Sequence, residues 1–174
     1  MQIVTVPNPV LTKKAEKVTE FNDNLKTLVE NLKQALNTSK TPGAGLACPQ
    51  IGISKRIFVA KKFFTDPAGN DTFVEIVFIN PEILSQSKTT EISFEGCLSI
   101  PNTYGKVERA EKITVRYQDE NGNLKKLKAE DYFARVIQHE NDHLDGILFT
   151  SKVIGQIIDE KQLDKLIEQE RETL

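Results

Sequence analysis

The hydrophobic residues between positions 23 and 38 recur at helical spacing. Leucine, valine or alanine stands at every third or fourth position, and lysine, glutamate and asparagine fill the other side. Such a stripe predicts an amphipathic helix of roughly 23–38 that lays one face on a hydrophobic core. The residues of this face are Leu25, Leu28, Val29, Leu32, Ala35 and Leu36.

The middle of the chain has the shorter hydrophobic period of β-strands. ITVRYQ and LKKLKA flank DENGN (119–123), whose Asn-Gly pair is a strong signal for a β-hairpin. The other segments that predict strands are QIVTV (2–6), RIFVA (56–60), FVEIVFIN (73–80, closed by Pro81) and the alternating residues of about 82–94.

Two further helices are predicted in the C-terminal part. One begins near Glu130 and ends at Gly146, which suits the glycine position after a helix. The other is amphipathic and occupies about the last 15 residues. Its apolar positions are Ile158, Leu163, Leu166 and Ile167. Because strands dominate the centre and helices flank them, the pattern indicates an α+β fold.

Composition favours a globular protein and argues against binding to nucleic acids or membranes. The 174 residues carry a net charge of −2, are 39% hydrophobic and contain no repeat or linker, which favours one globular domain over residues 1–174. No block of lysine and arginine is long enough to indicate a nucleic-acid or membrane surface. Since no secretory, transit or membrane-length segment is present, we expect a cytoplasmic protein without DNA or membrane partners.

The only two histidines stand four residues apart in QHENDHLDG (138–146), with Glu140 directly after the first. Residues four apart on a helix lie above one another on one face, so His139 and His143 face the same point. Two imidazoles and a carboxylate in this order form the HExxH arrangement of metal hydrolases. The sequence therefore predicts a metal-binding helix whose histidines are turned inward.

The third protein ligand is not on this helix. A catalytic ion usually takes three protein ligands and keeps one position for water, but HLDGILF lacks the downstream ligand of the HExxH peptidases. The remaining soft donors are Cys48, in PGAGLACPQIG, and Cys97, in FEGCLSIPN. Either cysteine could instead be a small buried hydrophobe, and the residues alone leave this choice open.

Three segments together resemble the peptide deformylase family. GAGLACPQ (43–50), EGCLS (95–99) and QHENDHLDG follow the family patterns G-x-G-L-A-A-x-Q, E-G-C-L-S and Q-H-E-x-D-H-L-x-G in the same order. Cys48 is the one departure, because the family usually has alanine there. The resemblance covers nearly the whole chain. We therefore expect mixed, mainly antiparallel strands around a central HExxH helix, with an N-terminal amphipathic helix and a C-terminal helix.

The resemblance implies a metal site and its ligands. Cys97, His139 and His143 would hold one divalent ion, with Fe²⁺ expected and Zn²⁺, Ni²⁺ or Co²⁺ able to occupy the site.

The resemblance also implies the reaction. The enzyme would remove the formyl group from the N-terminal formylmethionine of nascent polypeptides and release formate. A water activated by the ion would attack the formyl carbon, with Glu140 as general base and then acid. The Gln50 side-chain amide and the Leu98 N–H would stabilise the oxyanion.

Substrate contacts follow from the same segments. The chain around Gly45 and Gly96 is suited to receive a peptide by strand addition. Glu95 and Arg109 are expected to form a supporting ion pair, and Phe94 and Val136 could equally be core residues. The substrate-binding residues that we predict are Ala44, Gly45, Phe94, Glu95, Gly96, Tyr104, Tyr132, Arg135 and Val136.

Two alternatives stand beside an active deformylase. One is an HExxH metallopeptidase. The other is a non-catalytic homologue that binds the ribosome or the nascent chain, since the family's C-terminal helix has been associated with ribosome docking. Here this helix carries more acidic than basic residues, unlike a helix suited to RNA phosphates. A separate hypothesis concerns Cys48, which, if accessible, could couple oxidatively to Cys97 and expel the metal.

Overall fold

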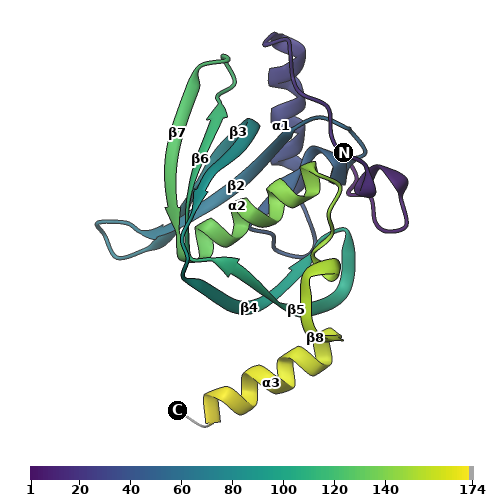
Figure 1. Cartoon of the computed structure of the whole chain (residues 1–174), viewed down its shortest axis with the longest axis vertical. Helices are drawn as coiled ribbons and strands as arrows, with labels where there is room; N and C mark the ends of the chain where they lie inside the picture. Colours follow the sequence, from purple (N-terminus) through teal and green to yellow (C-terminus); the bar gives the residue numbers. More distant parts are fainter. Residues whose placement is uncertain (173–174) are drawn as a thin grey trace.

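The computed structural model describes residues 1–172, in which two β-sheets enclose one central helix (Figure 1). The larger sheet has the strand order β1-β2-β3-β6-β7 and the smaller one the order β4-β5-β8. All paired strands within these sheets run antiparallel. The helix α2 (Asp131–Leu144) contacts strands of both sheets. These features confirm the α+β class and the central place of the helix that carries the histidines.

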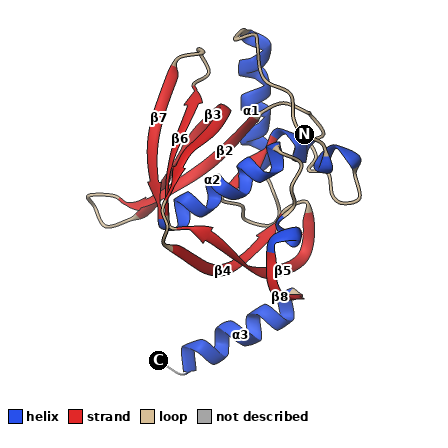
Figure 2. Cartoon of the chain, in the orientation of Figure 1, coloured by secondary structure: helices blue, strands red, loops and turns tan. Residues whose placement is uncertain are grey.

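The strands of the larger sheet are β1 (Gly45–Ala47), β2 (Ile57–Thr65), β3 (Asp71–Gln86), β6 (Lys112–Gln118) and β7 (Leu124–Glu130). The strands of the smaller sheet are β4 (Thr90–Cys97), β5 (Ile100–Ala110) and β8 (Val153–Ile158). Short 3₁₀ helices are η1 (Pro9–Thr12), η2 (Cys48–Ile51) and η3 (Phe149–Lys152). Figure 2 separates the helices from the strands by colour.

The helix α1 (Asp23–Asn37) confirms the predicted N-terminal amphipathic helix. Its N-cap is Asn22, whose side-chain oxygen accepts a hydrogen bond from the Leu25 N–H at 3.2 Å. The predicted apolar face is buried against β1 and β2, except for Leu28, which is partly buried. The helix therefore closes one side of the core next to the first strand of the larger sheet.

The end of α2 is set by Gly146, as its sequence position predicted. Gly146 has a φ of 71°, a conformation that favours glycine. A β-carbon there would also lie 2.7 Å from the backbone of Thr12. Arg56 supports the same end, because its guanidinium donates to the Leu144 carbonyl oxygen at 3.1 Å. Contacts with Thr12 and Arg56 thus hold the C-terminal end of α2 in place, and with it the nearby His143.

The strand expected to close at Pro81 is longer than predicted. β3 continues through Pro81 because its pairing with β6 shifts register between Ile79 and Glu82. A bulge tolerates a residue that has no N–H to donate to the ladder. The predicted hairpin around DENGN is confirmed by the pairing of β6 with β7, and Gly122 at its turn has a φ of 82°.

The strand predicted at residues 2–6 is wrong. The N–H groups of Val4 and Val6 donate to the carbonyl oxygens of Gln50 and Ser99, at 2.8 and 3.0 Å. Gln50 lies in η2 and Ser99 in the turn between β4 and β5. Because the two partners belong to different elements, the segment has no neighbouring strand with which to form a ladder.

The C-terminal helix α3 (Glu160–Glu172) is confirmed, but it begins later than predicted. Ile158 belongs instead to β8, which pairs with β5 and was not predicted. β8 is mostly exposed, so its sequence lacks the alternation that marks a half-buried strand. α3 extends away from the two sheets (Figure 1), and positions 173–174 lie outside the described residues. None of the helices within residues 1–172 has the length and apolar character needed to span a membrane.

Candidate metal centre and substrate cavity

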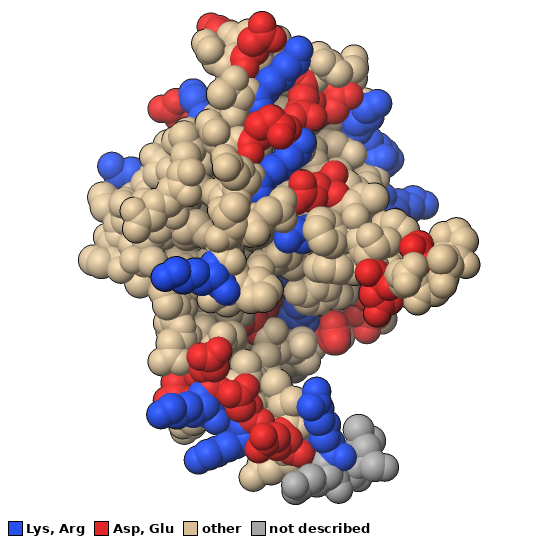
Figure 3. Space-filling view, turned by 180° about the vertical axis from the view of Figure 1, so that it is seen from behind, with Lys and Arg blue, Asp and Glu red and all other residues tan. Residues whose placement is uncertain are grey.

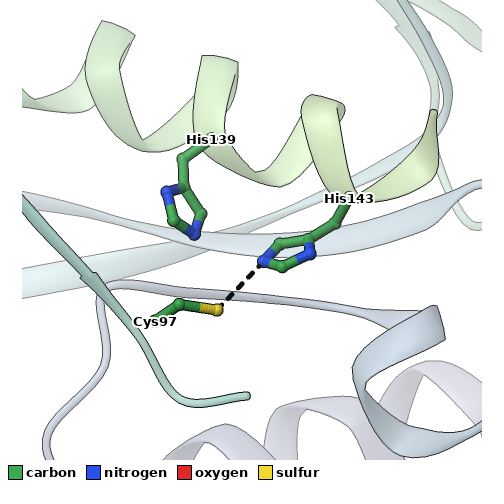
Figure 4. Close-up of side chains that lie close together, drawn as sticks. All are labelled: Cys97, His139 and His143. Atoms are coloured by element: carbon green, nitrogen blue, oxygen red, sulfur yellow. Dashed lines mark hydrogen bonds between the residues drawn. The ribbon is translucent and has the colours of Figure 1, made fainter. Parts of the chain in front are cut away.

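The structure brings together the three predicted metal ligands. Cys97 ends β4, and His139 and His143 project from successive turns of α2 toward it (Figure 4). One donor atom from each lies within 4.8 Å of the others, and Cys97 Sγ is 3.2 Å from His143 Nε2. A thiolate and two imidazoles within this span suit a four-coordinate divalent ion with one open position. The donor set and its spacing therefore fit a metal.

Glu95 joins the histidine side of this centre to a buried ion-pair network. Its carboxylate contacts His139 Nδ1 at 2.9 Å, both oxygens accept from Arg109 at 2.9 Å, and Arg135 adds a bond at 2.9 Å. The predicted pair of Glu95 with Arg109 is thus confirmed. Burial alone would raise the pKa of Glu95, but the hydrogen bonds from His139 and Arg109 hold it well below its ordinary value. An ionised Glu95 accepts the Nδ1–H and leaves Nε2 of His139 free to act as a ligand.

The carboxyl group of Glu140 is enclosed beside the donor cluster. The side chain is buried, and its Oε2 has no hydrogen-bond partner among the described residues. Burial raises the pKa of Glu140 to about 7, partly opposed by the charge of His139. A β-carbon built on Gly45 would lie 2.6 Å from Oε1 of Glu140. Glycine at position 45 of β1 therefore provides the space that this carboxyl group occupies.

The side-chain amide of Gln50 has one fixed orientation. Its Oε1 accepts from the N–H of Ala47, the residue that precedes the 3₁₀ helix η2, at 2.8 Å. Its Nε2 therefore points the other way, 3.5 Å from Cys97 Sγ and 3.3 Å from Ser99 Oγ. Leu98, the second predicted oxyanion donor, lies in the turn after Cys97. The amide N–H groups of Gln50 are thus aimed at the donor cluster before any substrate arrives.

A cavity of about 400 Å³ opens over these groups. β1 and β4, the edge strands of the two sheets, form its sides, so the main chain at Gly45 and Gly96 borders it. All nine predicted substrate-binding residues line this cavity, and so do Gln50, Leu98, Cys97, His139 and Glu140, whereas His143 lies behind the lining. Phe94 and Val136 are therefore wall residues of the cavity, and Val136 belongs to the hydrophobic core as well.

Gly96 and Tyr104 occupy opposite positions on β4 and β5. A β-carbon on Gly96 would lie 2.6 Å from Cε1 of the Tyr104 ring. The aromatic ring thus covers the face of Gly96 from which a side chain is missing. Gly96 was expected to let a ligand approach the backbone closely, but on this face the Tyr104 ring occupies that space.

The role of Asp142 was not predicted from the sequence, whereas the interpretation of Cys48 as a small buried core residue is confirmed. Asp142 lies one residue before His143 and forms a buried ion pair with Arg109. Its position three residues after His139, on the inward face of the helix, was the available signal. Cys48 is fully buried in the core beside α1, and burial raises its pKa to about 12. Without access or thiolate character it cannot take part in the proposed oxidation.

Comparisons with known proteins show to which family this chain is similar. The sequence model of polypeptide deformylase matches residues 1–157. The chain is 44% identical over 151 residues to a peptide deformylase of Acidobacterium capsulatum, covering 87% of this chain and 85% of the relative. It is 38% identical over 165 residues to that of Finegoldia magna, covering 95% of each.

Solved structures of the same kind are also similar to this chain. The peptide deformylase of Thermotoga maritima is 40% identical with a TM-score of 0.78, over 88% of this chain and 97% of that one. That of Plasmodium falciparum is 38% identical with a TM-score of 0.79, over 98% of each chain. The chain therefore belongs to the peptide deformylase family.

Proposed function

We propose that the chain removes the formyl group from the N-terminal formylmethionine of nascent polypeptides, using the cluster of Cys97, His139 and His143. The observation that carries the proposal is the convergence of these three donors beside one cavity. Glu140 and Gln50 line the same cavity with Cys97 and His139. The HExxH peptidase and the non-catalytic homologue receive no support from the comparisons, which match deformylases along most of the chain.

Cys97, His139 and His143 are the residues that would hold the metal. A divalent ion bound there supplies a Lewis acid, which polarises the formyl oxygen and lowers the pKa of water. We infer Fe²⁺ as the ion from the membership of the deformylase family; a donor set of one thiolate and two imidazoles also suits Zn²⁺, Ni²⁺ or Co²⁺. Glu95 keeps His139 in the tautomer that a ligand needs, by accepting its Nδ1–H at 2.9 Å.

Glu140 is the proposed proton carrier. Its carboxylate takes a proton from the attacking water and returns it to the amine of methionine as the C–N bond breaks. The formyl carbon gains the water oxygen and leaves as formate, so no further reactant is needed. The unpartnered Oε2 supports this role, because it has no competing hydrogen bond within the described residues.

Gln50 and Leu98 are the proposed donors to the oxyanion. The Gln50 Nε2 group is already turned toward Cys97, because its Oε1 is held by the Ala47 N–H. A donor that needs no reorganisation when charge develops lowers the barrier most effectively, and losing one typically costs about 10²–10³ in rate. The Leu98 N–H would complete the pair from the turn that follows Cys97.

The substrate would enter as an extended strand between β1 and β4. Both are edge strands whose main chain borders the cavity at Gly45 and Gly96, so backbone hydrogen bonds can hold a peptide of any sequence. The methionine side chain would lie against Phe94, Tyr132 and Val136, which supply apolar surface in the cavity wall.

The test is release of formate from formyl-Met-Ala-Ser by protein reconstituted anaerobically with Fe²⁺ or Ni²⁺. We expect Glu140→Gln to lower kcat by about 10²–10⁴, the usual contribution of a general acid–base. Glu30→Gln makes the same chemical change at an exposed position of α1 and should leave the rate unaltered. Formate no higher than with Glu140→Gln would contradict the proposal, and cleavage of unformylated Met-Ala-Ser would favour a peptidase.

A further inference from the structure

A residue beyond the family match also lines the substrate cavity. The deformylase match ends at residue 157, whereas Glu160, the first residue of α3, contributes to the cavity wall together with Asn102 and Tyr104. This part of the wall lies close to the metal ligands, because Tyr104 covers Gly96, which precedes Cys97 in the chain.

Three contacts fix the start of α3 at the cavity. β8 pairs with β5 so that Ile158 lies opposite Tyr104. The Glu160 N–H donates to the Asn102 side-chain oxygen at 2.9 Å. The side chains of Asp159 and Gln162 each accept from the other's N–H, at 2.9 and 3.0 Å. The position of Glu160 beside the cavity is therefore set by the fold and not by an isolated loop.

Glu160 brings a free negative charge to this wall. It is exposed and takes part in no ion pair among the described residues. The N–H groups that would offset it at the helix start are already bonded to Asn102 and Asp159. Asp164 follows one turn later on the same face, and both acids raise the pKa of Tyr104 beyond the effect of its burial. Figure 3 shows that acidic and basic side chains alternate over the exposed surface of α3.

The other charges that line the cavity do not cancel Glu160. Glu95 and Arg135 are ion-paired with each other, and His139 and Glu140 belong to the proposed centre. Lys40 lines the cavity from the segment that precedes β1. β1 belongs to the larger sheet, whereas β4 and β5 belong to the smaller one. The wall that a peptide meets after Gly96 thus carries one carboxylate, that of Glu160, which no other charge of the lining neutralises.

We propose that Glu160 is a specificity-determining residue, which favours formylated chains carrying lysine or arginine at the second or third position. The inference rests on the proposed function. An extended peptide advances about 3.4 Å per residue, so the residues after methionine pass from Gly96 to Tyr104 and Glu160. A cation there is attracted and an anion repelled, which changes binding more than the chemical step.

The test compares formyl-Met-X-Ser and formyl-Met-Ala-X, where X is lysine, glutamine or glutamate. For the wild type at low salt, we expect kcat/KM to be about two- to fivefold higher for lysine than for glutamate at one of these positions, within the range for an exposed charge pair. The difference should lie in KM. It should shrink at about 1 M salt, where screening acts within about 3 Å.

Glu160→Gln should remove the preference and Glu160→Lys should reverse it. Glu168→Gln removes the same charge from an exposed position of α3 outside the cavity and should keep the preference. Turnover of formyl-Met-Ala-Ser with equal lysine-to-glutamate ratios in wild type and Glu160→Gln would overturn this inference alone. Absence of turnover with formyl-Met-Ala-Ser would overturn the proposed function as well.

Discussion

At the scale of single residues, the site depends on Gly45 having no side chain. Gly45 has no positive φ, so its backbone would accept any residue. Its β-carbon would nevertheless lie within 2.6 to 2.9 Å of three atoms of Glu140, closer than atoms can approach without a shift. The neighbouring carboxyl group, and not the backbone conformation, therefore requires glycine here.

We predict that Gly45→Ala displaces Glu140 and lowers kcat for formate release by about 10²-fold, the typical result of misplacing a catalytic group by about 1 Å. Bound metal per chain should stay at the wild-type level, because the substitution touches none of the three donors. Rate measurements combined with metal analysis check this. An alanine variant that keeps the wild-type kcat would show that the carboxyl group has room to move.

At the same scale, the sequence predicted which side chains carry the chemistry better than it predicted how those side chains are packed. The pair of histidines and Glu140 were found from helical spacing alone. The opposite natures of Cys48 and Cys97 could not be found this way, because both lie next to glycine or proline segments. Only packing shows that one thiol is sealed in the core while the other faces the histidines.

At the scale of elements, Arg109 holds α2 to the smaller sheet. From β5 its guanidinium pairs with Glu95 on β4 and Asp142 on α2. The side chains of Arg109 and Glu95 are each 4% exposed, so removing the cation takes a buried partner from Glu95 and from Asp142 at once. Removing one partner from a buried ion-pair network is far more costly than losing a surface pair.

We predict that Arg109→Met lowers the free energy of unfolding by about 3–5 kcal/mol. Arg116→Met is the matched control, because Arg116 pairs with Glu82 across β6 and β3 with side chains 47% and 58% exposed. Exposed pairs contribute about 0–1 kcal/mol. Urea unfolding of both variants gives the comparison, and equal losses would mean that the buried network does not support the packing of α2.

The elements found from the sequence are those with a strong period and one buried face. α1, α2 and the β6–β7 hairpin have these properties and were predicted close to their bounds. β8 is an exposed edge strand, and the extension of β3 through Pro81 needs a bulge defined by β6. In both cases the neighbouring strand decides the structure, and local sequence does not contain it.

At the scale of the whole molecule, the three metal ligands come from two parts of the fold, the smaller sheet and the helix α2. Cys97 belongs to the smaller sheet, and both histidines belong to the helix between the sheets. An ion that binds only the folded chain stabilises it by mass action, by about 2.7 kcal/mol when free metal is 100-fold above Kd.

We therefore predict that removing the metal with a chelator abolishes formate release and lowers the melting temperature, and that adding Ni²⁺ restores both. In Cys97→Ala, which lacks the donor from β4, Ni²⁺ should produce a smaller rise in melting temperature. Calorimetry with and without metal measures this. Identical melting temperatures of the metal-loaded and metal-free wild type would contradict a role for the ion in holding the two parts together.

The sequence by itself determined the α+β class, the main helices and the HExxH pair of histidines, because periodicity and this motif are local properties of the chain. The resemblance to the deformylase family added Cys97 of EGCLS as the expected third ligand. Tertiary structure decided how distant segments meet. It sealed Cys48 in the core, placed Tyr104 over Gly96, bound Arg109 to Asp142 and brought Glu160 to the cavity. These contacts depend on strand order, register and packing between elements, which a local pattern of residues does not encode.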